Sequence, residues 1–540
     1  MTTGSTLKRR LSFQNLESNM LDNKALEVQP SSGSARKHAI TVRRRWFGVG
    51  ILLVAVVLIL SLTLTLAGGS SSSPEEQDSS LEVSQEKALS VDQSVLAQSV
   101  NTFGTRVLDQ IAAENNNSPS IDAIFLSPWG ITHALSMLHE GASPESEARK
   151  QLQHVVFNIQ NGGSASNTAI RTATKALSSA IISGSNDINL TVSDANSAWV
   201  SPSFQLLDSY VDALKEYYLA EARPLTSAAE VNSWVESATR GKITNLIDEP
   251  TAASASLILV NAIYFKGLWE APFNVEETTR QPFYLTQGDG GTVDVPLMYL
   301  QYKRGSSVQA ARYKASEIDC IAVKLDYKME GQDYYALLAM PEGALSSSGN
   351  GGLALQSSGV NYISALSSCR ASILASLGSA SESQNVDSVE NGTSSSGSGA
   401  GEIIEGEGGL EWISVGHPDM DTAKIYLPRF EVDYSTSLAP ALASIGLSSI
   451  FTPGNFGGIA QNGGDLAVSD VLHKVYVKVD EQGTEAAAAT GIVMVTSMPL
   501  EPPKELVVRF DRPFMFSVVN KKTGLALFVG EVYKPEEWEE

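Results

Sequence analysis

The stretch Gly483-Thr-Glu-Ala-Ala-Ala-Ala-Thr490 decides how this chain folds and what it can do. It follows the run Val475-Tyr-Val-Lys-Val479, whose valines favour a β-strand, whereas four consecutive alanines favour a helix. The segment is therefore uncommitted between two states and adjoins a predicted strand. An alanine-rich helix or an ordinary surface loop is the plain alternative reading of the same composition.

The residue types of this stretch suit a loop that enters a sheet as a new strand. Alternate residues of a strand point to one face. The residues that would face inward are all small, namely Thr484, Ala486, Ala488 and Thr490. Glu485 falls on the other face and can stay in solvent, while Gly483 supplies the freedom of a hinge. About ten newly paired amides at ~1 kcal/mol each would release on the order of 10 kcal/mol.

Charge divides the chain of 540 residues into two parts. Residues 1–46 carry nine Lys and Arg against three Asp and Glu, a net charge of +6. Because the whole chain carries −22, the remainder carries −28. Such an acidic globular part argues against binding of nucleic acid. We expect residues 1–46 to form a basic, disordered tail.

Residues 47–67 are 21 residues without a charge, which is the length of a bilayer-spanning helix. Arg43, Arg44 and Arg45 precede them, and the positive-inside rule then keeps the tail in the cytosol. The sequence predicts a single-pass type II membrane protein with an extracellular or lumenal domain. A cleaved signal peptide, and hence a secreted protein, is the alternative.

Low-complexity segments mark the edges of the globular part. Residues 68–94 are rich in Ser and acidic residues and read as a stalk, and the domain is expected over residues 95–535. Residues 346–409 are rich in Gly and Ser and read as a disordered surface insertion, with a short helix near 362–377. Glycosylation sequons lie at Asn116, Asn189 and Asn391. The two cysteines, Cys320 and Cys369, could pair or stay free.

Catalytic motifs are missing from the sequence. None of the six histidines lies in an HExxH motif or beside a cysteine at metal-binding spacing, and no P-loop or G-x-S-x-G motif is present. We therefore expect no enzymatic activity, no metal and no cofactor.

A series of motifs runs in one order through the domain. It comprises Ile124-Phe-Leu-Ser-Pro-Trp-Gly-Ile131, Ala134-Leu-Ser-Met-Leu138, Asn232-Ser-Trp-Val235, Thr239-Arg-Gly-Lys-Ile243, Leu259-Val-Asn-Ala-Ile-Tyr-Phe-Lys-Gly-Leu-Trp269, Val295-Pro-Leu-Met298, Leu427-Pro-Arg-Phe430, Val471-Leu-His-Lys474, Val479-Asp-Glu-Gln-Gly-Thr484, Phe510-Asp-Arg-Pro-Phe514 and Leu527-Phe-Val-Gly530. Their order and spacing resemble those of the serpins, the serine protease inhibitor family.

The resemblance implies an α+β fold with three β-sheets, eight to nine helices and an exposed reactive-centre loop. It also implies a mechanism in which a protease attacks the loop, and the cleaved loop then inserts into the central sheet and disables the acylated protease. The target would be a serine protease, or a cysteine protease as an alternative. A non-inhibitory binding or storage protein is the alternative function, and a monomer is expected.

Within this resemblance the hinge of the loop comprises Glu481, Gly483, Thr484, Glu485, Ala486, Ala487, Ala488, Ala489 and Thr490. Counting onward places the reactive bond between Ser497 and Met498, with Met494, Met498 and Leu500 as alternative cleavage residues. Pro499 disfavours cleavage after Met498, since proline would then follow the cut bond. A small neutral Ser497 favours an elastase-like or subtilisin-like protease.

Further residues carry over from the family. Ser127, Asn261 and His473 would form a buried polar cluster, called the shutter, beneath the central sheet. Gly130 stands where many members have a second serine, so that part of the network would be absent or replaced by water. Trp269 would pack in the breach, where insertion begins. The segment 171–185 lacks the basic helix of a heparin site.

Overall fold

The computed structural model describes residues 93–115, 121–159, 166–183, 189–286, 291–303, 306–329, 333–347, 353–377, 410–484 and 504–538. They belong to one compact unit, Glu86–Glu540. Several predicted features lie outside these ranges. They are the tail, the transmembrane segment 47–67, most of the stalk, hinge residues 485–490, the reactive bond at Ser497 and the sequons at Asn116 and Asn391. No helix within the described ranges is long and apolar enough to cross a bilayer.

The described helices are α2 (Gln93–Asn115), α3 (Pro128–Gly141), α4 (Glu147–Val155), α5 (Asn167–Ser183), α6 (Asp208–Tyr217), α7 (Ala228–Ala238), α8 (Glu249–Ser254), α9 (Tyr362–Ser376) and α10 (Ala439–Leu442). The strands are β1 (Ala123–Leu126), β2 (Leu190–Val200), β3 (Glu221–Pro224), β4 (Leu257–Leu268), β5 (Thr279–Leu285), β6 (Gly291–Lys303), β7 (Gln309–Ala315), β8 (Ile318–Asp326), β9 (Tyr334–Pro341), β10 (Leu345–Ser347), β11 (Leu353–Leu355), β12 (Ile413–Ser414), β13 (Thr422–Pro428), β14 (Phe430–Ser437), β15 (Asp470–Val479), β16 (Gly483–Thr484), β17 (Glu505–Arg509), β18 (Phe514–Asn520) and β19 (Ala526–Val532).

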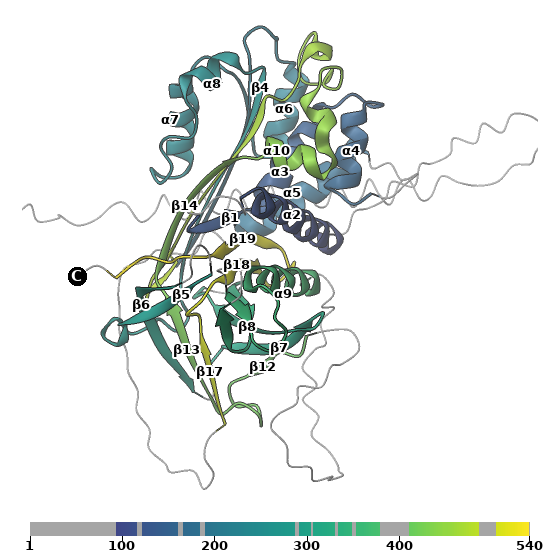
Figure 1. Cartoon of the computed structure of the whole chain (residues 1–540). Helices are drawn as coiled ribbons and strands as arrows, with labels where there is room; N and C mark the ends of the chain where they lie inside the picture. Colours follow the sequence, from purple (N-terminus) through teal and green to yellow (C-terminus); the bar gives the residue numbers. More distant parts are fainter. Residues whose placement is uncertain are drawn as a thin grey trace, which may run out of the picture. The chain divides into compact units, whose positions relative to one another are not determined.

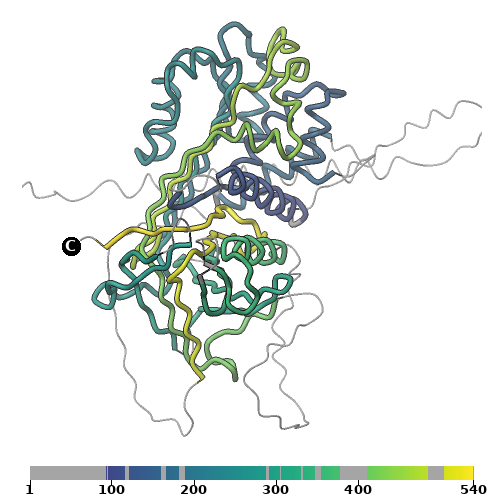
Figure 2. The backbone as a smooth tube through the Cα atoms, viewed as in Figure 1, coloured from purple at the N-terminus to yellow at the C-terminus, as the bar shows by residue number. Residues whose placement is uncertain are grey.

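Three large sheets organise the domain, as the resemblance implied. A seven-stranded sheet has the order β1-β19-β18-β9-β8-β7-β12, and a four-stranded sheet has the order β17-β13-β6-β5. The third sheet has the order β14-β15-β16-β4-β2-β3, and β10 and β11 form a separate hairpin. Strand β1, from the start of the domain, pairs with β19 from its end (Figures 1 and 2).

Helix α2 buries apolar residues that recur at helical spacing. Leu96, Val100, Phe103 and Val107 recur every three or four residues and are buried, whereas Val95 is 55% exposed. Helix α3 is buried along nearly its whole length. It begins at Ser127, whose hydroxyl accepts a hydrogen bond from the Gly130 backbone N–H at 3.0 Å and caps the helix.

The short helix expected near residues 362–377 is confirmed as α9, but the expectation that it belongs to a surface excursion is wrong. Figure 1 shows this helix lying against β18 and β8, and its residues Tyr362, Cys369 and Ile373 are fully buried. Its apolar residues recur with a helical period, so the helix buries one face against the sheet although serines fill the other. Residues 378–409 lie outside the described ranges.

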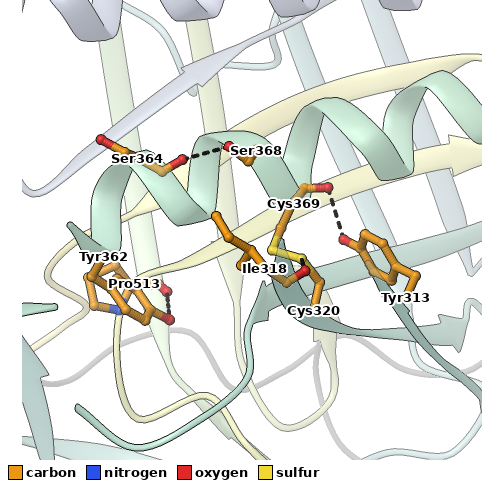
Figure 3. The surroundings of a disulfide bond; sticks show 8 residues. All are labelled: Tyr313, Ile318, Cys320, Tyr362, Ser364, Ser368, Cys369 and Pro513. Carbon is orange, nitrogen blue, oxygen red and sulfur yellow. Dashed lines mark hydrogen bonds between the residues drawn. A yellow bond between two sulfur atoms is a disulfide. The ribbon is translucent and has the colours of Figure 1, made fainter. Parts of the chain in front are cut away.

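A disulfide joins α9 to the seven-stranded sheet. Cys369 of α9 bonds to Cys320 of β8, and both are fully buried (Figure 3). The Tyr313 hydroxyl donates to the Cys369 carbonyl at 2.9 Å, and the Tyr362 hydroxyl donates to the Pro513 carbonyl at 2.9 Å. The pairing that the sequence left open is therefore made, and it fixes the helix to the core.

Candidate functional site

The first two residues of the inserting stretch already form part of the six-stranded sheet. Gly483 and Thr484 make up β16, in which Gly483 pairs with Leu268, and Thr484 pairs with both Gly267 of β4 and Val479 of β15. Farther along, β15 and β4 pair directly in parallel over residues 470–476 and 258–264. The sheet is thus parted where the hinge enters and closed below that point.

The entry point accepts only small residues. Thr484 is completely buried, and its hydroxyl lies 2.8 Å from the hydroxyl of Tyr327. A Cβ atom on Gly483 would lie 2.1 Å from the Gly267 carbonyl oxygen, closer than any real Cβ contact. Burial raises the pKa of Tyr327, so this phenol stays neutral and available for hydrogen bonding.

Trp269 holds the backbone that leads into the hinge. Its indole N–H donates to the Asp480 carbonyl at 3.0 Å, and its backbone N–H donates to the Gln482 carbonyl at 2.9 Å. The ring also stacks on Tyr327 with 4.8 Å between centroids. The sequence predicted only packing for Trp269, whereas the structure adds two hydrogen bonds to the backbone of residues 480 and 482.

Glu481 anchors the same segment through its side chain. The carboxylate accepts hydrogen bonds from the Arg429 guanidinium, at 2.6 to 2.9 Å, and from the Thr278 hydroxyl at 2.6 Å. Burial alone would raise the pKa of Glu481, but these hydrogen bonds and the positive charge of Arg429 hold it below its usual value. The hinge therefore starts from a fixed, ionised anchor.

The predicted shutter residues come together below the entry point. The Ser127 backbone N–H donates to His473 Nε2 at 2.9 Å, and His473 of β15 lies opposite Asn261 of β4. Burial lowers the pKa of His473 to about 3, so the imidazole is neutral. The side chain of Asn261 fills the space above Gly130, where an added Cβ would lie 2.3 Å from its Oδ1 atom. The amide, rather than a serine hydroxyl, thus occupies that position.

The sequence reasoning missed a buried carboxylate beside this cluster. Asp194 of β2 accepts from Trp129 Nε1 at 2.8 Å and from Asn196 Nδ2 at 2.8 Å, and it lies 3.0 Å from His133 Nδ1. The two α3 residues are more than 60 positions from the two β2 residues in the sequence, so only the packing of the helix on the sheet joins them. The sequence did carry one indication of this contact. A Trp and an Asp both need hydrogen-bond partners when they are buried, so Trp129 and Asp194 were candidates for pairing.

Asn189 precedes β2, and its carbonyl accepts from the Leu268 N–H at 3.0 Å, which puts this sequon at the hinge end of the sheet. In the parts of the chain that the structure describes, no group of three or more His, Cys, Asp or Glu residues could hold a metal ion.

Comparison with protein families decides the classification. The family model "Serpin (serine protease inhibitor)" matches residues 98–350 and 402–535, which together are more than half of the chain. The chain belongs to the serpin family.

Relatives from distant organisms resemble this serpin over most of its length. An uncharacterized serpin-like protein of Thermococcus kodakarensis is 27% identical over 450 residues, which cover 81% of this chain and 85% of that protein. Iripin-8 of Ixodes ricinus is 28% identical over 456 residues, covering 82% and 94%. Serpin B10 of Homo sapiens is 26% identical over 474 residues, covering 82% and 99%.

Solved structures share the serpin fold. Arabidopsis AtSerpin1 in its native stressed conformation has a TM-score of 0.57 at 22% identity, covering 82% of this chain and 99% of that one. Serpin48 of Tenebrio molitor has a TM-score of 0.58 at 20% identity, covering 82% and 98%.

In the described part of this serpin, only Gly483 and Thr484 lie between β15 and β4. Direct pairing of β15 with β4 leaves no strand between residues 258–264 and 470–476. To admit one, the two strands would have to separate by about 4.8 Å, the spacing of neighbouring strands. On one face of this sheet, Val231 and Val235 of α7 are fully buried in an apolar cluster with Ile258 and Val260 of β4.

Proposed function

We propose that this serpin inhibits a serine endopeptidase as a suicide substrate, by inserting its cleaved reactive-centre loop between β15 and β4. The observation that carries the proposal is the position of β16, where Gly483 and Thr484 stand between the two strands and begin the inserted strand. A cysteine protease is the alternative target.

The residues that follow Thr484 fit the same path. Continuing the strand would bring small side chains inward at Ala486, Ala488 and Thr490, because Thr484 itself faces inward. About ten new backbone hydrogen bonds at ~1 kcal/mol each give on the order of 10 kcal/mol for distorting a bound protease. The reactive bond is proposed at Ser497–Met498, and its small residue favours an elastase-like or subtilisin-like target.

An inhibition assay tests this function. The protein is mixed with elastase-like, subtilisin-like and trypsin-like proteases, and covalent complexes that survive SDS are separated by electrophoresis. We expect such a complex with an elastase-like or subtilisin-like enzyme, and mass spectrometry of the released C-terminal peptide to begin at Met498. Cleavage of the loop by every protease without any complex would refute the inhibitory function.

Thr484→Arg, with Thr484→Ser as its matched control, tests insertion itself. Arginine cannot be buried without a partner in the space that Thr484 fills beside Tyr327, whereas serine keeps the hydroxyl. The arginine variant should be cleaved at the loop without forming complexes, and the serine variant should form them as the wild type does. Equal complex formation by both variants would contradict insertion through this entry point.

We further propose that residues 47–67 anchor a monomeric serpin as a type II membrane protein. The Cys320–Cys369 disulfide supports an extracellular or lumenal domain, because disulfides persist in oxidising compartments. Full-length protein should stay with membranes in alkaline carbonate, and Asn189→Gln should lose one glycan. Release of the intact domain into the medium would instead favour secretion after cleavage.

A further inference from the structure

The carboxylate of Asp194 joins three elements beneath the six-stranded sheet. From α3 it accepts a hydrogen bond from Trp129 Nε1 at 2.8 Å and contacts His133 Nδ1 at 3.0 Å. From β2 it accepts from Asn196 Nδ2 at 2.8 Å, and from β4 it accepts from Asn261 Nδ2 at 3.2 Å. Its side chain is only 7% exposed, so these groups stand in place of water.

Helix α3 packs on β19, β2 and β4, and it is tied to the seven-stranded sheet through β1 and to β15 through Ser127. It follows β1 directly, and β1 pairs with β19 along its whole length. The Ser127 N–H also binds His473 of β15. Strand β14 is held to the same body, since Phe430 packs on Phe514 and Phe516 with 5.9 and 5.3 Å between ring centroids.

The β2–β4 half must therefore move when the sheet opens. A new strand between β15 and β4 shifts the two halves apart by about 4.8 Å. Because the direct link through β1 and the Ser127–His473 bond hold α3 to the β19 and β15 side, the shift carries Asp194 away from Trp129 and His133. A hydrogen bond of about 3 Å cannot survive a displacement of that size.

We infer that Asp194 is a positioning residue that tethers β2 and β4 to α3, and that breaking its bonds to Trp129 and His133 limits the rate at which the sheet opens. The inference rests on the proposed loop insertion. This tether is separate from the Ser127–His473 contact. It acts on β2 and β4, whereas the Ser127–His473 contact acts on β15.

The charge on Asp194 strengthens the tether. Burial alone would raise the pKa of Asp194, but the hydrogen bonds from His133, Asn196 and Trp129 hold it below its usual value. The carboxylate is therefore ionised at neutral pH, and hydrogen bonds to an ionised acceptor are roughly twice as strong as neutral ones.

A labelled peptide with the sequence of residues 484–495 provides a direct probe of sheet opening. The full-length protein in detergent is incubated with the fluorescent peptide, and the rate of stable incorporation is measured by native electrophoresis. Asp194→Asn keeps the side-chain shape but removes the charge, and we expect incorporation about tenfold faster or more. Trp129→Phe removes one donor and keeps an aromatic ring, so we expect a rise of about threefold.

Glu531→Gln is the matched control. Glu531 is a buried carboxylate of β19 that pairs with Arg370 at 2.8 Å and accepts from the Tyr533 hydroxyl at 2.6 Å, away from the β15–β4 junction. Its loss should lower the guanidinium unfolding midpoint without changing the rate of peptide incorporation. This separates opening of the sheet from general destabilisation.

The outcomes distinguish the tether from the proposed function. Two results would overturn the tether and leave loop insertion standing. In the first, Asp194→Asn and Glu531→Gln speed peptide incorporation equally. In the second, wild type takes up the peptide but neither Asp194→Asn nor Trp129→Phe takes it up faster. If wild type and Asp194→Asn both refuse the peptide, the tether is overturned. Failure of the proposed function would show separately, as the lack of a covalent complex with any protease.

Discussion

Removing the disulfide between Cys320 and Cys369 should have a large and calculable effect on stability. The bond closes a loop with a sequence separation of 49 residues. The loss of chain entropy in the unfolded state then corresponds to about 4 kcal/mol at 25 °C. We therefore expect Cys320→Ala to lower the free energy of unfolding by about 4 kcal/mol, plus a small cost for the space left by the sulfur.

The pattern among single and double variants gives the sharpest test. Breaking the bond from either side removes the same constraint, so Cys320→Ala, Cys369→Ala and the double variant should lose nearly the same free energy. Guanidinium unfolding of the oxidised proteins measures it. Single-variant losses that simply add in the double variant would show that the cysteines act independently and would refute the bond.

Accessibility of the thiols supplies a second readout of the same claim. Both cysteines are fully buried, so reductant should reach the bond only when the protein opens. Thiol-reactive label should therefore bind native wild type only after denaturation with reductant. Labelling of the native, unreduced protein at Cys320 or Cys369 would contradict the structure and remove its support for an oxidising compartment.

Three further predictions follow from the hinge and the shutter. Because His473 has a pKa of about 3 when folded and about 6.5 when unfolded, its contribution to stability is complete above pH 6.5. As pH falls from 6.5 toward 3 it should be lost at about 1.4 kcal/mol per unit, and His473→Gln should flatten guanidinium midpoints measured from pH 7 to 5. Gly130→Ser should lower the free energy of unfolding by about 1 to 3 kcal/mol, because its Cβ would lie 2.3 Å from the amide of Asn261. Unchanged stability would show that Asn261 can move away. Trp269→Phe loses the indole N–H that donates to the Asp480 carbonyl, so it should lower the free energy of unfolding by about 1 kcal/mol and speed hydrogen exchange near the hinge. Unchanged exchange would contradict a role for this hydrogen bond in holding the hinge.

Local patterns in the sequence predicted the parts of the molecule that depend on neighbours along the chain. Strand alternation predicted that the small Thr484 faces inward, and Thr484 is completely buried. The family motifs predicted three sheets and named Ser127 and His473, which are in contact.

Contacts between distant segments could not be predicted in the same way. Asp194 and Trp129 are 65 residues apart and meet only because α3 packs beneath β2. The sequence predicted a short helix within the serine-rich residues 346–409 but not its burial, because only packing on the sheet places Leu366, Cys369 and Ile373 in the core. Composition averaged over a long segment therefore does not reveal that a helix within it is buried.

The thermal stability of the protein before and after cleavage of its loop tests insertion most directly. A protease that cuts within residues 485–503 produces the cleaved form, and calorimetry compares the two. On the order of 10 kcal/mol of new strand pairing should raise the unfolding temperature by roughly 10 °C or more, and cleaved Thr484→Arg should show no rise. An unchanged or lower unfolding temperature for the cleaved wild type would contradict insertion of the loop between β15 and β4.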